Sequence, residues 1–99
     1  MLVKANQSSD SRIRLMYVAS FGAAQYKCTD RRTAKPFNPI LGETFELLHP
    51  DYRYFAEQVS HHPPVSAVHA DSDHYIYTCD TNAKMSFNGT YLKAIPIGF

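Results

Sequence analysis

The sequence lacks several features that mark particular classes of protein. Its 99 residues contain no Trp, two Cys and four Gly, and the formal net charge is +1. Two cysteines are too few for the disulfide framework of a small secreted domain, and so small a net charge argues against a nucleic-acid partner. No apolar run reaches the roughly 20 residues of a membrane-spanning helix, and no secretory leader is recognisable. We therefore expect a cytoplasmic protein with reduced cysteines and no nucleic-acid partner.

The residues that are present indicate a folded chain rich in strands. Hydrophobic residues make up 44% of the sequence and charged residues 19%, which is typical of a globular domain. Seven Tyr and six Phe favour β-structure over helix. A length of 99 residues allows one small domain at most.

The first half of the chain divides into three segments. Residues 1–9 are polar and unpatterned, so we expect a frayed start. Residues 10–28 carry apolar side chains on neighbouring helical turns behind capping residues, which predicts a buried structural helix. Ser20 is expected to hydrogen-bond to a carbonyl one turn earlier in it. Residues 29–43 are basic and proline-rich, and prolines at 36 and 39 exclude a helix there.

In residues 44–97 the apolar pattern changes to a period of two, and turn signals separate short segments. The strongest turn signal is Asn88-Gly89. The predicted fold is mainly β with one N-terminal helix, an α+β chain whose antiparallel meander has an open edge suited to self-association. Its six strands are expected at 44–48, 53–60, 65–70, 75–79, 84–87 and 91–95.

The segment from Glu57 to Pro64, EQVSHHPP, is the most informative part of the chain. The two prolines lack backbone N–H groups, so a pairing strand must stop, bend or lie at an edge there. Neighbouring residues of an extended chain point apart, which argues against one metal ion shared by His61 and His62, and no zinc-binding motif supports them. No nucleophile elbow accompanies Ser60, so an enzyme is not expected.

Binding of an anion suits these residues better. A phosphate monoester accepts several hydrogen bonds and is held by donors that converge from different segments. His61 and His62 can donate, and Lys35 and Asn38 offer an ammonium and an amide from a loop that prolines make rigid. By residue type alone, an alternative is equally supported: Lys35 as a solvated surface lysine and Asn38 as a cap of the turn before Pro39.

Two long motifs resemble those of the oxysterol-binding protein family. EQVSHHPP, at residues 57–64, is similar to the family's signature, and KPFNPILGETFE, at residues 35–46, is similar to its second hallmark. The helical segment RLMYVA, at residues 14–19, also resembles the one that precedes these motifs in the family. The resemblance extends over nearly the whole chain from about Ser11 onward.

The resemblance implies a fold and a function. The family's lipid-binding domain is an incomplete β-barrel around a tunnel, and this chain corresponds to part of it. The domain exchanges phosphatidylinositol 4-phosphate for a sterol or another phospholipid between membranes, as a peripheral protein at membrane contact sites and without a metal or other cofactor. By the resemblance, His61 and His62 bind the 4-phosphate, and Lys35 and Asn38 hold the headgroup. The alternative is a non-transporting remnant that acts as an interaction module.

Overall fold

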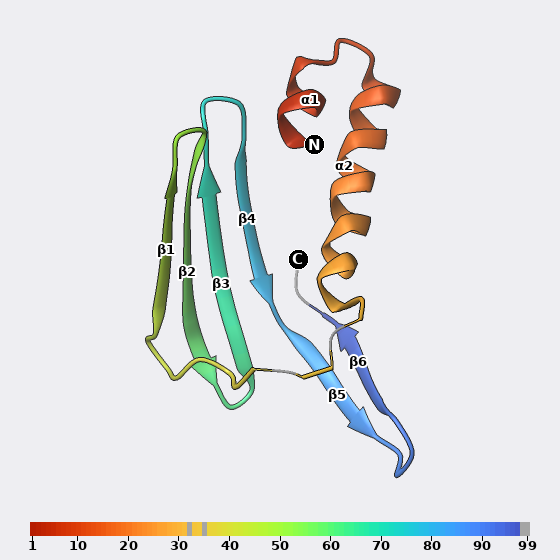
Figure 1. The fold of residues 1–99 in the computed structure, drawn as a ribbon, viewed down its shortest axis with the longest axis vertical. Helices are drawn as coiled ribbons and strands as arrows, with labels where there is room; N and C mark the ends of the chain where they lie inside the picture. The colour runs from red at the N-terminus through yellow and green to blue at the C-terminus, as the bar shows by residue number, and fades with distance from the viewer. Residues whose placement is uncertain (32, 35, 98–99) are drawn as a thin grey trace. The chain divides into compact units, whose positions relative to one another are not determined.

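A computed structural model describes residues 1–31, 33–34 and 36–97 (Figure 1). The chain forms two compact units, Met1–Phe37 and Asn38–Phe99, and each is described by itself. The first unit is helical and the second consists of strands. No helix in these ranges is long and apolar enough to cross a membrane.

The first unit begins with a helix that the sequence did not predict. Residues 1–9 were expected to be frayed, but α1 spans Leu2–Gln7 and packs on α2. Its Ala5 is only 5% exposed, and the guanidinium of Arg14 donates to the carbonyl of Ser8 at 2.9 Å. Six residues are too few to show a helical period and too few to be stable alone, so tertiary contact is what orders this helix.

The second helix, α2, spans Ser11–Gln25, and a 3₁₀ turn continues it over Tyr26–Thr29. Asp10 caps it because its carboxylate accepts the backbone N–H of Arg12 at 2.8 Å. Ser20 donates to the carbonyl of Met16 at 2.7 Å, as predicted. The expectation of a buried helix was wrong: no α2 residue is buried, and Met16 is 68% exposed.

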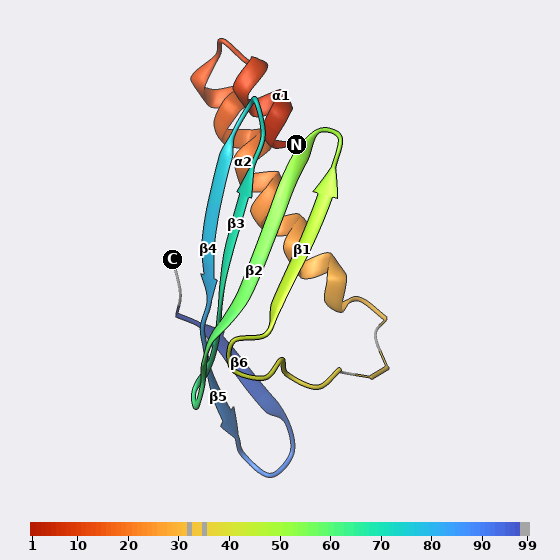
Figure 2. The same ribbon diagram turned by 90° about the vertical axis from the view of Figure 1, so that its left-hand side faces the viewer.

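The second unit contains all six strands and confirms a mainly antiparallel β fold. Strands β1 to β4 form one sheet in chain order, while β5 and β6 form a separate two-stranded sheet (Figures 1 and 2). A single meander was expected, so this division is a correction, and only Asn82 separates β4 from β5. The bounds are Thr44–His49 (β1), Tyr52–His61 (β2), Pro64–Asp71 (β3), Ile76–Thr81 (β4), Ala83–Phe87 (β5) and Leu92–Pro96 (β6).

The turn predicted at Asn88-Gly89 joins β5 to β6. Gly89 has φ +91°, which an L-residue rarely adopts. The side chain of Asn88 accepts the backbone N–H groups of Thr90 at 3.1 Å and Tyr91 at 3.0 Å. Asn88-Gly89 therefore predicts this hairpin correctly, because the turn requires a residue with positive φ.

The larger sheet has two faces of different character. Side chains alternate between the two faces along the paired strands. One face carries Tyr54, Gln58, Val68 and Ala70. The other face carries Arg53, Phe55, His69 and Asp71. Ala70 and Gln58 are the buried residues of the described part of this unit. The core is thus small and lies on the Gln58 face of the sheet.

Candidate functional site

The predicted histidines lie at the turn between β2 and β3. His61 is the last residue of β2 and pairs with Pro64, the first residue of β3. Both imidazoles are exposed, and their ring centroids are 4.6 Å apart at an interplanar angle of 61°. The sequence-based expectation that the two side chains point apart was wrong, because the chain turns at His62 and does not remain extended.

A β-bulge in β2 determines which way His61 faces. The pairing with β3 passes from Gln58↔Ser66 to Ser60↔Val65, so Val59 is the extra residue. Gln58 and His61 consequently oppose Ser66 and Pro64, two positions apart on β3, and project from the same face of the hairpin. The bulge therefore places His61 on the same face of the sheet as the buried Gln58.

The proline-rich loop ends in a tight turn over residues 40–43. The backbone N–H of Glu43 donates to the carbonyl of Ile40 at 3.0 Å, and the N–H of Ile40 donates to the Glu43 carboxylate at 2.9 Å. Gly42 has φ +78°, and such a turn needs glycine at this position. The turn fixes the chain just before β1 begins at Thr44.

This turn is attached to β2 at one residue, Gln58. The N–H of Gly42 donates to the Gln58 carbonyl at 2.9 Å, and the N–H of Gln58 donates to the Glu43 carbonyl at 3.0 Å. These two bonds extend the β1–β2 ladder beyond Thr44↔Glu57. The proline-rich loop therefore enters the sheet at the end where the β2–β3 turn lies (Figures 1 and 2).

The side chain of Gln58 is only partly satisfied. It is 2% exposed, and the Ser66 hydroxyl donates to its Oε1 at 2.5 Å. Its Nε2 is buried and finds no hydrogen-bond partner among the described residues. A buried unpaired donor costs about 1–3 kcal/mol in folding stability, so a glutamine is unfavourable for stability at this position. The amide lies beside a small cavity of about 60 Å³. The cavity is lined by the loop (Pro39 and Glu43), by β1 and β2, and by Ser66 of β3.

The four residues predicted to bind a headgroup are only partly described. Asn38 is exposed and lies in the loop that leads to the Ile40–Glu43 turn. His61 and His62 share the β2–β3 turn. Lys35 lies outside the described residues, so the prediction for it stays a prediction. Among the described residues no group of three or more His, Cys, Asp or Glu is placed to hold a metal ion.

No described carboxylate is paired with the imidazoles of the turn. In the described ranges, neither His61 nor His62 forms an ion pair with a carboxylate. The Glu43 carboxylate is engaged by the N–H of Ile40. The two exposed imidazoles thus keep N–H groups that a ligand could reach.

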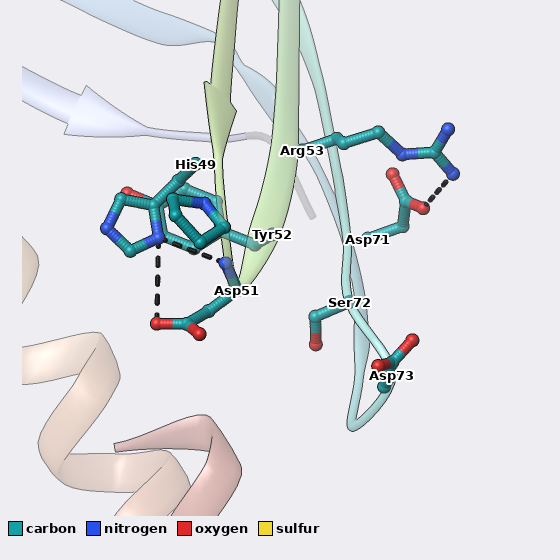
Figure 3. Close-up of a pocket in the computed structure, with 8 residues that line it drawn as sticks. His49, Asp51, Tyr52, Arg53, Asp71, Ser72 and Asp73 are labelled. Carbon is teal, nitrogen blue, oxygen red and sulfur yellow. Dashed lines mark hydrogen bonds and ion pairs between the residues drawn. The ribbon is translucent and has the colours of Figure 1, made fainter.

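A larger hollow of about 330 Å³ lies at the opposite end of the sheet, where the β1–β2 and β3–β4 turns meet (Figure 3). Here the Arg53 guanidinium donates to the Asp71 carboxylate at 2.6 Å, and this hydrogen bond raises the pKa of Arg53. His49 Nδ1 lies 3.6 Å from the Asp51 carboxylate, and its ring stacks on Tyr52. Asp51 and Asp73 add negative charge, so this hollow is unsuited to a phosphate. No sequence pattern predicts this hollow, since its lining comes from two turns about 20 residues apart in the chain.

The described chain combines a mainly antiparallel sheet with an exposed histidine pair and a proline-rich loop that is hydrogen-bonded to β2. The sequence profile of the family described as oxysterol-binding protein matches residues 1–99, so the chain belongs to that family. It is 48% identical over 100 residues to oxysterol-binding protein homolog 2 of Saccharomyces cerevisiae and 43% identical over 101 residues to human oxysterol-binding protein-related protein 7. Each match covers 99% of this chain but 8% and 12% of those proteins, so the chain spans about a tenth of their length.

Solved structures agree with this assignment. The Osh1 ORD domain in complex with ergosterol matches 98% of this chain with a TM-score of 0.92 and 44% identity. The Osh3 ORD of Saccharomyces cerevisiae in complex with PI(4)P matches 98% of this chain with a TM-score of 0.81 and 32% identity. The matched region is 24% and 27% of those chains. The described strands therefore correspond to part of an ORD fold.

Proposed function

We propose that the chain is a phosphoinositide-headgroup-recognising part of a lipid-transfer domain. In this proposal His61 and His62 donate to the 4-phosphate of phosphatidylinositol 4-phosphate, and Lys35 and Asn38 hold the rest of the headgroup. The observation that carries the proposal is the pair of exposed imidazoles at the β2–β3 turn, whose ring centroids lie 4.6 Å apart. No described carboxylate pairs with them. The role is binding, without a catalytic residue, at the surface of a membrane.

The chemistry of the turn suits a phosphate with several free oxygens. Two imidazole N–H groups from adjacent residues can donate to different oxygens of one phosphate. Asn38 stands on a loop that prolines and the Ile40–Glu43 turn restrict, so little conformational entropy is lost when the loop binds. Exchange for a sterol or another phospholipid is the larger activity that we propose for the whole domain, in line with the Osh1 ORD domain in complex with ergosterol.

Flotation of the chain with liposomes tests the headgroup assignment. Vesicles of phosphatidylcholine are compared with vesicles that contain either phosphatidylinositol or phosphatidylinositol 4-phosphate. We expect binding to depend on the 4-phosphate, because the proposed donors address that group. Equal binding to the phosphatidylinositol vesicles and to the phosphatidylinositol 4-phosphate vesicles would show that the headgroup assignment is wrong.

A second candidate function is an interaction module, favoured by uncovered apolar and edge surfaces. In the described sheets β1 and β4 are end strands, and large apolar side chains such as Phe45 and Ile76 are 59% and 75% exposed. Such a surface favours association with another chain. Size-exclusion chromatography with lipid extraction separates the two functions. A monomer with stoichiometric lipid contradicts the interaction module, and a lipid-free oligomer supports it.

A further inference from the structure

We propose that Gln58 is a positioning residue for headgroup recognition, which holds the loop of Asn38 and the turn of His61 and His62 in a fixed relation. The inference rests on the proposed function and adds to it a residue that does not itself contact the ligand. Gln58 is 2% exposed, so its role is exerted through neighbouring residues.

The main chain of Gln58 secures the loop. Its carbonyl accepts from Gly42 at 2.9 Å and its N–H donates to Glu43 at 3.0 Å. Glu43 in turn holds Ile40 through two further bonds, from its own N–H and to its carboxylate. An unbroken series of hydrogen bonds thus runs from β2 to the residue two positions after Asn38.

The side chain of Gln58 secures the turn. The bond from the Ser66 hydroxyl to Oε1 closes the last regular pair of β2 and β3 before the bulge. His61 projects from the same face, opposite Pro64, two positions along β3 from Ser66. At about 3.3 Å per residue that is about 7 Å of strand. The Gln58–Ser66 bond therefore fixes the register from which the histidine turn departs.

Because Nε2 is unpaired, replacing Gln58 can distinguish a positioning role from a stabilising one. An apolar side chain of similar length would remove a buried donor that has no partner in the described chain and leave both main-chain bonds in place. It would also remove the acceptor of the Ser66 hydroxyl. The lost hydrogen bond and the relief of the unpaired donor are of similar size, so only a small net change in stability is expected. A residue kept only for stability would give the opposite result, so stability and binding can be measured against each other.

The test compares Gln58→Met with the wild-type chain by flotation on vesicles containing phosphatidylinositol 4-phosphate and by thermal unfolding. We expect affinity to fall about 3- to 10-fold, because a histidine turn that the Gln58–Ser66 bond no longer holds has to be ordered when the ligand binds, while Tm stays nearly unchanged. Ser66→Ala, which removes the hydroxyl donor, should weaken binding similarly, and Ser66→Thr, which keeps it, should bind like wild type. Gln7→Met makes the same change on an exposed helical residue and should have no effect.

The outcomes separate this inference from the proposed function. If wild type prefers the 4-phosphate and Gln58→Met binds equally well, only the inference is overturned. A loss of binding that follows a lower Tm in both Gln58→Met and Ser66→Ala also overturns it, since the role would then be purely structural. If wild type shows no preference, the proposed function fails and the inference fails with it.

Amide NMR spectra without lipid provide a second measurement. Gln58→Met should shift the signals of Ser66, His61 and His62 together, because the side chain secures the turn. It should leave Asn38 and the β5–β6 hairpin unchanged, since both main-chain bonds to the loop remain. Shifts restricted to residues 57–59 would overturn the coupling.

Discussion

The rings of His61 and His62 meet edge to face, with centroids 4.6 Å apart and planes inclined at 61°. In a regular strand, adjacent side chains point to opposite faces of the sheet. The turn at His62 brings them together, so one small ligand can reach both imidazoles.

This pairing predicts the effect of removing each imidazole. His61→Ala and His62→Ala should each weaken binding to phosphatidylinositol 4-phosphate vesicles by roughly 10-fold or more, because hydrogen bonds to charged groups contribute about 1.5–3 kcal/mol. Binding is measured by flotation, with His74→Ala as the control, since His74 is an exposed histidine in the β3–β4 turn. Wild-type binding by both variants would contradict the assigned roles.

Asn38 should respond to charge more strongly than to the loss of its amide. Asn38→Ala removes a neutral donor and should weaken binding about 3- to 10-fold. Asn38→Asp keeps the shape but places a carboxylate near the phosphate, so it should weaken binding further. Isothermal titration with soluble inositol 1,4-bisphosphate measures both variants. If the aspartate variant bound as tightly as the alanine variant or more tightly, Asn38 would not face the phosphate.

Two glycines provide a matched pair for stability. Gly42 has φ +78°, so Gly42→Ala should destabilise the chain by about 1–2 kcal/mol through backbone strain alone. Apart from its two chain neighbours, no described residue has an atom within 4 Å of the added Cβ. Gly22 lies within α2 with equally open surroundings, and Gly22→Ala should stabilise the helix by up to about 1 kcal/mol. Urea unfolding followed by circular dichroism measures both changes. Shifts in the same direction would contradict the turn geometry.

Because of Tyr54, the stability of the folded chain is expected to depend on pH in alkaline solution. Its pKa is raised above the ordinary value of 10.0, chiefly because it is partly buried and secondarily because of the charge of Cys79. The folded chain therefore holds this proton more tightly than the unfolded chain. Its contribution to stability is complete below about pH 10 and is lost as the pH rises through the folded pKa.

Tyr54→Phe should accordingly make the decline of Tm above pH 10 shallower than in wild type. Thermal unfolding between pH 8 and pH 11 measures the slope, with Tyr91→Phe as the control because Tyr91 is 59% exposed. The same slope in wild type and Tyr54→Phe would show that Tyr54 ionises alike in both states.

Local backbone chemistry made much of the fold predictable. The strands were located by their period of two, and the β5–β6 hairpin by Asn88-Gly89, because those signals act over a few residues. Helix α1 was missed because six residues show no period and depend on contact with α2. The division into two sheets was missed because one residue, Asn82, separates β4 from β5 and alternation continues across it.

The sequence suggested the residues of the candidate site but not their geometry. The prolines indicated where β2 had to stop, and the roles of the histidines and Asn38 were implied by the family resemblance and stay a prediction. The hydrogen bonds that join Gln58 to Gly42, Glu43 and Ser66 involve main-chain groups or partners eight or more residues away. No short sequence pattern predicts such bonds, so the sequence identifies Gln58 only as a strand residue.

The bulge at Val59 decides the face from which His61 projects, in a way that composition does not show. Gln58 and His61 are three residues apart, and in a strand of the same length without the bulge they would project from opposite faces. Replacing Val59 by another residue changes one exposed side chain, and deleting it would leave His61 two positions after Gln58, still opposite Pro64, in a regular ladder. Pairing Val59 with β3 at unchanged chain length would instead turn the imidazole of His61 to the other side of the hairpin. The direction of this imidazole is therefore set by strand register as well as by residue type.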